Sequence, residues 1–171
     1  MKRLTLMRHG DAKWKDSGVP DFERPLNRRG AAEAEAMARR LLEIDLLPTL
    51  IISSPAIRAR QTAEIIAREA RLSPRHLRME EALYLARSEE ILKVVRATGP
   101  RVPHLMIVGH NPGISRAALE LGAPDNGEEM ATGGLCILEF DTRTWSTASA
   151  RSLRHSRNES PPGGLLTSLW S

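Results

Sequence analysis

Two of the five histidines stand directly after short apolar runs, in LTLMRHG and in HLMIVGH. Arg8 comes immediately before His9, and Arg58 follows a third apolar run, LIIS, by a few residues. The planar guanidinium of arginine matches the oxygens of a phosphate group, and a histidine among fixed cations keeps one ring nitrogen free to attack phosphorus. Together with His110, these side chains have the chemistry of a site for a phosphate dianion, in which the arginines and histidines supply the positive charge without a metal ion.

The spacing of apolar residues predicts the elements that position these side chains. Short β-like runs alternate with longer helical patterns, which indicates an α/β domain with a largely parallel central sheet. The predicted strands are residues 3–7, 50–53, 76–79, 105–108 and 135–140. The predicted helices are residues 28–44, capped by Asn27; a helix beginning at Ser54 and Pro55 with the serine as N-cap; residues 88–99; and residues 112–121.

Loops at the carboxyl ends of parallel strands meet at one edge of a sheet, where ligands of such folds bind. Arg8 and His9 come just after the first predicted strand, Ser53 and Ser54 at the end of the second, and Gly109 and His110 after the fourth. Arg58 lies about one turn into the following helix, whose N-terminal amides favour an anion. We therefore expect one site that gathers these groups.

The composition limits the class of protein. The 171 residues, 41% hydrophobic and 27% charged, fit one globular domain, which we place at residues 1–146. Residues 147–171 are rich in serine, arginine, glycine and proline, and we expect a loosely structured or disordered tail. The net charge of +4 suits an anionic substrate, while the 4% of aromatic residues and the absence of a long apolar run argue against nucleic acid and membrane partners. We expect a cytoplasmic protein, with Cys136 as a buried core residue.

At this point the motifs resemble a known family. LMRHGDA resembles the RHG signature of the histidine phosphatase superfamily, which includes the cofactor-dependent phosphoglycerate mutases, and SSPAIRARQTAEII and VGHNPGI resemble its second and third motifs. The RHGDA and GHNP forms and the short chain are most similar to SixA-type phosphohistidine phosphatases. The resemblance implies a three-layer α/β/α sandwich, with His9 as the nucleophile that becomes phosphohistidine. It also implies that Arg8, Arg58 and His110 form the phosphate pocket.

The general acid is left open. The superfamily's mutases and broad-specificity phosphatases place a glutamate after the third strand, where this chain has MEEALYLARSEE, and Glu80 and Glu81 do not align firmly with it. Asp11 is a second candidate, although an aspartate there can equally cap or orient its loop. A zinc site built from the histidines at positions 9, 76, 104 and 110 is the other alternative, but their spacing fits no standard ligand pattern, and we expect no metal and no cofactor.

The sequence therefore predicts a phosphatase that acts through a phosphohistidine intermediate. Its expected partner is a phosphorylated substrate, with a histidine-phosphorylated protein as the first candidate. A small-metabolite phosphatase of the same superfamily and a non-catalytic phosphate-binding module are the alternatives. A mutase is disfavoured because the short chain offers no insertion to enclose a second phosphate. The sequence does not specify an oligomeric state.

Overall fold

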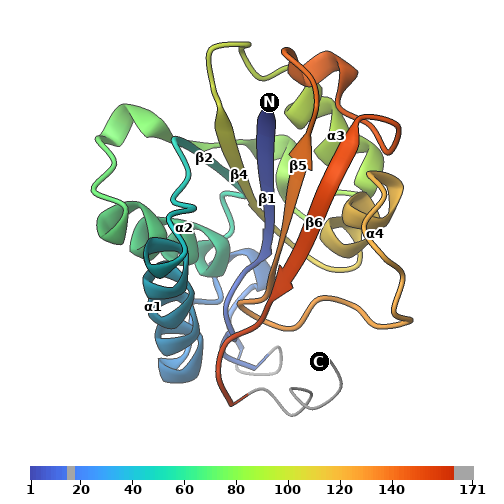
Figure 1. The fold of residues 1–171 in the computed structure, drawn as a ribbon. Coiled ribbons are helices and arrows are strands. Elements are labelled where there is room, and N and C mark those ends of the chain that lie inside the picture. Colours follow the sequence, from blue (N-terminus) through green and yellow to red (C-terminus); the bar gives the residue numbers. More distant parts are fainter. Residues whose placement is uncertain (15–17, 164–171) are drawn as a thin grey trace.

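The computed structural model describes residues 1–14 and 18–163 of the chain, which build a central sheet between two layers of helices (Figure 1). In these residues the six strands lie in the order β3-β2-β4-β1-β5-β6. Neighbouring strands β3, β2, β4 and β1 are parallel, whereas β5 runs antiparallel to both β1 and β6. The strands are β1 (Lys2–Arg8), β2 (Leu50–Ser53), β3 (Leu77–Met79), β4 (His104–Gly109), β5 (Leu135–Phe140) and β6 (Leu153–Glu159).

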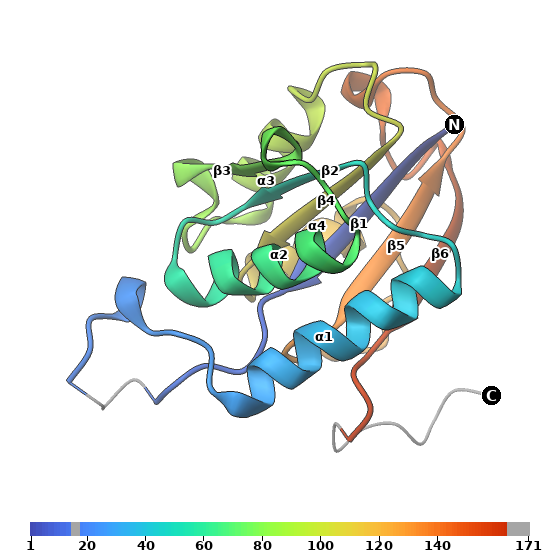
Figure 2. The same ribbon diagram turned by 90° about the vertical axis from the view of Figure 1, so that its left-hand side faces the viewer.

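The four α-helices of the described residues cover the two faces of the sheet. Helices α1 (Arg28–Glu43) and α2 (Ile57–Glu69) pack side by side on one face, and Figure 2 shows both in front of the strands. Helices α3 (Ser88–Arg96) and α4 (Gly113–Glu120) lie together on the other face. The predicted three-layer α/β architecture is confirmed.

The core is divided in two by the alternation of side chains along each strand, because successive residues of a strand point to opposite faces. On β4, Leu105 and Ile107 join the cluster beneath α3 and α4, whereas Met106 and Val108 join the cluster beneath α1 and α2. All four side chains have no exposed surface. The central strand is therefore buried on both faces, and its continuous apolar run reflects that burial.

Two local predictions are wrong. Leu153–Glu159, which we expected in a loosely structured tail from residue 147, form β6, paired antiparallel with β5. This edge strand is half-exposed and polar, so it lacks the apolar pattern of the inner strands. Ser54 does not cap a helix, because α2 begins at Ile57 after Ala56. The last eight residues of the expected tail, 164–171, lie outside the described residues.

Other boundaries agree closely with the expectation. Asn27 caps α1 through a hydrogen bond that its side chain accepts from the amide of Gly30. The third strand is one residue shorter than predicted, and α4 spans Gly113–Glu120. In the part of the chain that the structure describes, no helix has the length and apolar character needed to span a membrane.

Candidate active site

The four side chains singled out by the sequence meet at the carboxyl ends of the parallel strands. Arg8 ends β1 and His9 follows it, His110 directly follows β4, and Arg58 is the second residue of α2. The Arg58 Nε donates to Nε2 of His9 at 3.3 Å, and its Nη2 lies 3.3 Å from Nδ1 of His110. The centroids of the two imidazole rings are 5.1 Å apart. Residues from distant parts of the sequence therefore form one compact cationic cluster.

The ring of His9 is held with one nitrogen free. Its Nδ1 lies 2.7 Å from the carbonyl oxygen of Gly10, and since a carbonyl only accepts, Nδ1 carries the proton. Nε2 then holds a lone pair that faces Arg58. Burial, together with the charges of Arg58 and Arg8, lowers the pKa of His9 to about 4, although the hydrogen bond to Gly10 acts in the opposite direction. At neutral pH, His9 is thus a neutral imidazole with an available nucleophilic nitrogen.

His110 is fixed in the complementary orientation. Its Nε2 lies 2.7 Å from the Oγ of Ser54, and its Nδ1 faces the Arg58 guanidinium, which can only donate. Burial lowers the pKa of His110 to about 3, with added contributions from His9 and Arg58. Ser54, predicted as a helix cap, instead orients this histidine.

Close backbone packing sets the position of the loop that carries His9. The amide of His9 donates to the carbonyl of Gly109, which joins the ends of β1 and β4. A Cβ atom added at Gly10 would lie 2.5 Å from the carbonyl oxygen of Gly30, and one added at Gly30 would lie 1.9 Å from that of Asp11. Both glycines are therefore needed for the start of α1 to pack against the loop.

A buried glutamate, which the sequence reasoning missed, links two loops at the site. Glu33 lies on α1 with a residue exposure of 7%. One of its carboxylate oxygens accepts from the Asp11 amide at 2.9 Å, and the other accepts from the Thr132 hydroxyl at 3.1 Å. The sequence signal that could have revealed Glu33 is its position, as a charged residue, within the otherwise apolar face of α1. Glu33 thereby ties the loop after β1 to the loop before β5.

Arg8 has one buried donor without a partner. Its Nη1 donates to the carbonyl of Met130 at 3.0 Å, whereas its Nε is buried and has no hydrogen-bond partner in the described residues. Burial lowers the pKa of Arg8, and nearby carboxylates, Glu129 first, act in the opposite direction. A buried donor without a partner carries a desolvation cost, which a hydrogen-bond acceptor at that nitrogen would remove.

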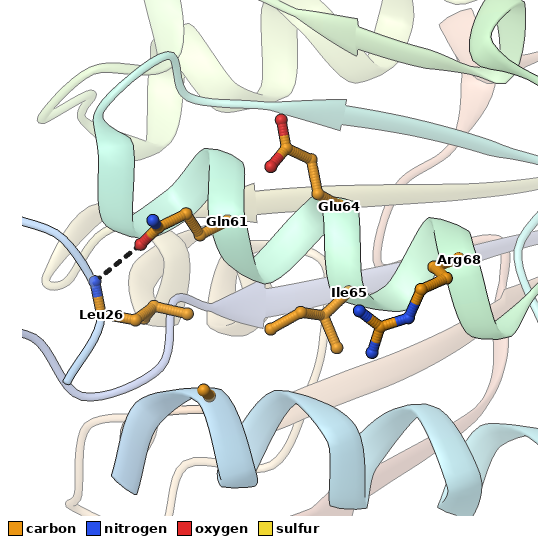
Figure 3. Close-up of a pocket in the computed structure, with 6 residues that line it drawn as sticks. Leu26, Gln61, Glu64, Ile65 and Arg68 are labelled. Atoms are coloured by element: carbon orange, nitrogen blue, oxygen red, sulfur yellow. Dashed lines mark hydrogen bonds between the residues drawn. The ribbon is translucent and has the colours of Figure 1, made fainter. Parts of the chain in front are cut away.

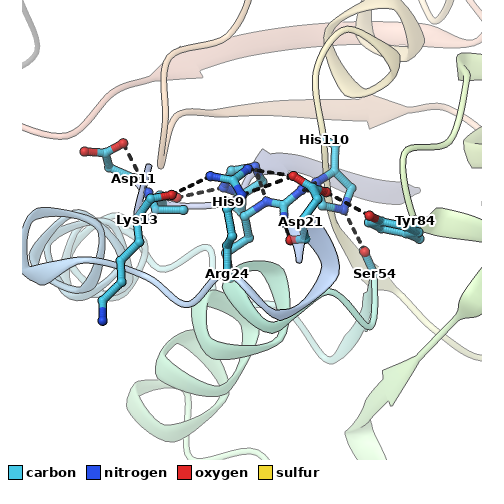
Figure 4. A network of polar contacts seen from close by, with 11 residues as sticks. His9, Asp11, Lys13, Asp21, Arg24, Ser54, Tyr84 and His110 are labelled. Carbon is cyan, nitrogen blue, oxygen red and sulfur yellow. Dashed lines mark hydrogen bonds and ion pairs between the residues drawn. The ribbon is translucent and has the colours of Figure 1, made fainter. Parts of the chain in front are cut away.

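Two further charged residues of the site come from the segment between β1 and α1, and sequence reasoning missed both. Asp21 accepts from Arg58 Nη2 at 3.1 Å and from the Tyr84 hydroxyl at 2.8 Å. Arg24 donates to the other oxygen of Asp21 through Nε and Nη2, at 3.1 and 2.9 Å. Figure 4 shows this network extending from Asp21 to both histidines. The short 3-10 helix Asp21–Glu23, which carries Asp21, has no periodic pattern that would have placed it here.

The three candidate acids of the sequence lie in different surroundings. Asp11 lines the cavity at the site, and its two carboxylate oxygens accept from the Ala12 amide at 3.1 Å and from Asn27 Nδ2 at 2.8 Å. Glu80 accepts from the amide of Ala82, and Glu81 is exposed; neither lines the cavity. The structure thus brings Asp11 to the site and leaves both glutamates outside it.

The remaining histidines are not part of a metal cluster. His104 is buried, with Nε2 2.8 Å from the Thr5 hydroxyl and Nδ1 3.1 Å from the Leu47 carbonyl, and His76 lies near Ser73. Within residues 1–14 and 18–163, no group of three or more His, Cys, Asp or Glu side chains is arranged to hold a metal ion. Cys136 is buried in the core, and burial raises its pKa to about 12.

The four side chains line a cavity, and a second cavity lies elsewhere on the surface. The cavity at the cluster has a volume of about 510 Å³, and its lining includes Arg8, His9, Arg58 and His110. Another cavity, of about 410 Å³, lies between α1 and α2, where Gln61 accepts from the Leu26 amide (Figure 3). None of the four site residues lines this second cavity. The chemistry of the chain therefore belongs to the first.

A cationic pocket with an oriented neutral histidine, at the carboxyl edge of a mainly parallel sheet, defines a phosphoryl-binding α/β protein. The model of the histidine phosphatase superfamily (branch 1) matches residues 4–83. An uncharacterised protein of Mycobacterium tuberculosis is 32% identical over 143 residues, which are 77% of this chain and 85% of that protein. An uncharacterised chloroplastic protein of Arabidopsis thaliana is 28% identical over 88% of this chain and 72% of its own length.

Solved structures agree with this result. A candidate phosphohistidine phosphatase SixA from Agrobacterium tumefaciens is 33% identical, with a TM-score of 0.72 over 81% of this chain and 92% of that chain. A SixA candidate from Nakamurella multipartitia is 27% identical, with a TM-score of 0.78 over 94% and 96%. The chain belongs to the histidine phosphatase superfamily, as its motifs predicted. Within that superfamily it is a SixA-like phosphatase.

Proposed function

We propose that this phosphatase removes the phosphoryl group from phosphohistidine side chains of proteins, by a metal-independent mechanism in which His9 becomes phosphorylated. The observation that carries the proposal is the orientation of His9, whose Nδ1 bond to Gly10 leaves the Nε2 lone pair facing Arg58. A site that only bound phosphate would gain little from a neutral imidazole among its cations. Arg8, Arg58 and His110 then hold the oxygens of the transferred group.

The reaction divides into two displacements at phosphorus. In the first, Nε2 of His9 forms a bond to phosphorus as the bond to the departing nitrogen or oxygen of the substrate breaks. In the second, a water oxygen forms a bond to phosphorus, the bond to His9 breaks, and inorganic phosphate leaves. Charge stabilisation by preorganised cations is the main task of the protein in such transfers.

The surroundings of the cavity favour a phosphoramidate substrate. The two glutamates of the stretch where related enzymes place their acid lie outside the cavity, and the acid side chains that line it are Asp11 and Asp21. A phosphorus–nitrogen bond is more labile than an alkyl ester, so a modest proton donor suffices for it. Similarity to the two SixA candidates supports the same substrate class. The cytoplasmic location of this protein stays a prediction, which cell fractionation would test.

The test combines phosphoenzyme trapping with a substrate panel. Radiolabelled histidine-phosphorylated carrier protein should label the enzyme with phosphate that is lost in acid and retained in alkali. His9→Ala should abolish the label, and His155→Ala, which changes an exposed histidine of β6, should keep it. Phosphohistidine should exceed sugar phosphates in kcat/KM. The opposite order would replace the proposal with a small-metabolite phosphatase, and phosphate binding without labelling or release would indicate a binding module.

A further inference from the structure

Asp21 has a position in the site that neither the family resemblance nor the sequence pattern assigned. It lines the same cavity as His9, and its side chain is 35% exposed. One carboxylate oxygen accepts from Tyr84 and Arg58, and the other accepts from Arg24 (Figure 4). A single guanidinium, that of Arg58, separates this carboxylate from the attacking nitrogen of His9.

The contacts of Arg58 place Asp21 in competition with a bound phosphoryl group. Arg58 donates through Nη1 to the main-chain carbonyl of Asp21 at 2.7 Å and through Nη2 to its carboxylate at 3.1 Å. A phosphoryl group in front of His9 Nε2 needs donors from the same guanidinium. A dianion next to a carboxylate also disfavours the ionised carboxylate. Binding of the substrate therefore both removes a partner of Asp21 and favours its protonation.

We propose that Asp21 is the proton-transfer residue of this active site. The inference deepens the proposed function and rests on it. When the phosphoryl group takes the Arg58 contact, the Asp21 carboxyl holds a proton and donates it to the departing group. It then accepts a proton from the water that attacks phosphohistidine.

The two steps balance. As the His9 Nε2–phosphorus bond forms, the bond from phosphorus to the leaving atom breaks, and its electron pair stays on that atom, which takes the proton from Asp21. As the water oxygen bonds to phosphorus, the bond to His9 breaks and its electron pair returns to Nε2. The proton of that water passes to Asp21. The carboxyl is thereby protonated again, and His9 is neutral.

The free site holds Asp21 in the opposite, ionised state. Burial opposes its ionisation, but hydrogen bonds from Tyr84 and Arg24 and the charge of Arg58 outweigh burial and hold the pKa of the carboxyl well below its usual range. The charged and titratable groups that face it are these three and His110. Of them, Arg58 and His110 are the two that a phosphoryl group would engage directly, and only Arg58 is hydrogen-bonded to Asp21, so substrate binding changes the balance at Asp21 more than at a surface carboxylate.

The geometry favours Asp21 over Asp11. Both oxygens of Asp11 accept hydrogen bonds that hold the local structure, from Ala12 and Asn27. The oxygens of Asp21, which lines the cavity, instead accept from the side chains of Arg58, Tyr84 and Arg24, and these can form other hydrogen bonds when a ligand binds. Tyr84 retains its proton, because burial and the Asp21 carboxylate raise its pKa, and it can orient the carboxyl throughout.

The experiment compares substrates whose leaving groups differ in their need for a proton. Asp21→Asn should reduce kcat/KM for alkyl phosphates by about 10²- to 10⁴-fold, less for phosphohistidine peptides, whose phosphorus–nitrogen bond is more labile, and least for p-nitrophenyl phosphate, whose leaving group departs unprotonated. Because the second step also slows, the variant should release a stoichiometric burst of p-nitrophenol. Inorganic phosphate should inhibit it at an equal or lower concentration, since a competitor for Arg58 is removed. Asp21→Glu should restore part of the lost activity.

Controls distinguish failure of this inference from failure of the proposed function. Glu81→Gln removes an exposed carboxylate outside the cavity and should behave like the native enzyme. Equal losses across the leaving-group series in Asp21→Asn, or weaker phosphate inhibition, would assign Asp21 a structural role and overturn the inference. A selective loss in Asp11→Asn instead would move the role to Asp11. Labelling of His9 by p-nitrophenyl phosphate needs no acid, so absence of label both in the native enzyme and in Asp21→Asn, where the phosphoenzyme should accumulate, would refute the proposed function itself.

Discussion

Arg58 Nε lies 3.3 Å from Nε2 of His9, so the guanidinium that we propose binds a phosphoryl group also faces the nitrogen that we propose attacks it. The same guanidinium contacts His110 through Nη2. Its side chain is 2% exposed, which removes the solvent screening that weakens surface charges. Arg58 therefore contacts both histidines, and its charge adds to the effect of burial in keeping His9 neutral.

Replacement of Arg58 tests this central position. Arg58→Ala should lower kcat/KM by about a hundredfold or more, comparable to the loss of one preorganised donor at a transition state. The matched control is Arg60→Ala, which removes an exposed arginine of the same helix that pairs with Glu64. Steady-state kinetics measures both, and a drop below about threefold for Arg58→Ala would show that the guanidinium acts elsewhere.

The pKa of His9 gives a spectroscopic test of the same contact. Burial and the neighbouring arginines lower it to about 4, so the imidazole should stay neutral down to about that pH. Removing the cation in Arg58→Ala favours the imidazolium form, so the pKa should rise. NMR titration of the labelled imidazole measures both values. An unchanged or lower pKa in the variant would contradict the assigned geometry.

Much of this site could be predicted because its residues directly follow strands that are recognisable from their apolar runs. Arg8, His9 and His110 are fixed by strand ends, and Arg58 by its place in the first turn of α2. Asp21 and Arg24 come from an irregular segment, whose path across the site depends on tertiary contacts that leave no periodic signal.

The two wrong local predictions, for β6 and for Ser54, also have physical causes. The β6 sequence LRHSRNE is mostly charged or polar because one face of this edge strand meets solvent, and charged side chains on an edge strand prevent pairing with other chains. Ser54 and Pro55 are typical of a helix start, but the serine side chain serves His110, and the helix begins two residues beyond Pro55. At this position the contact of Ser54 with His110 outweighs the preference of serine for a helix N-cap.

Removal of metal ions should leave activity unchanged. The proposed mechanism draws its positive charge from the guanidinium groups of Arg8 and Arg58, which would supply the charge stabilisation that a metal ion provides in other phosphoryl-transfer enzymes. Activity measured after dialysis against EDTA should match that of untreated enzyme. Loss of activity that magnesium or zinc restores would contradict the prediction.

Gly30 should tolerate no side chain. A Cβ atom there would lie 1.9 Å from the Asp11 carbonyl oxygen, so Gly30→Ala must displace the loop that carries His9. We expect a loss of about 1–3 kcal/mol in the free energy of unfolding, together with a large fall in activity. Gly99→Ala is the control, because a Cβ atom there meets nothing within 4 Å. Urea unfolding and kinetics measure both variants, and a fully active, stable Gly30→Ala would refute the packing argument.

Stability should fall in mild acid through His104. Burial, with the charge of Arg3, lowers the pKa of this histidine to about 4, below the value of about 6.5 in an unfolded chain. Its protonation therefore favours unfolding, and stability present above pH 6.5 is lost as the pH falls toward 4. Between pH 7 and 5 this side chain should account for about 2 kcal/mol.

Urea unfolding at the two pH values measures that change in native, His104→Gln and His155→Gln proteins. The pH dependence should shrink in His104→Gln and persist in His155→Gln, which alters an exposed histidine of β6. An equal dependence in all three proteins would exclude His104 as the source.

Asn27 belongs at once to the scaffold and to the site. Its Oδ1 accepts from the Gly30 amide to cap α1, while its Nδ2 donates to Asp11 and its main-chain amide donates to the Asp11 carbonyl. Helix ends open locally at a lower free energy than the whole fold requires. Each time the first turn of α1 frays, the loop that follows His9 loses its two contacts with Asn27, so mild denaturation should abolish catalysis while the central sheet is still intact.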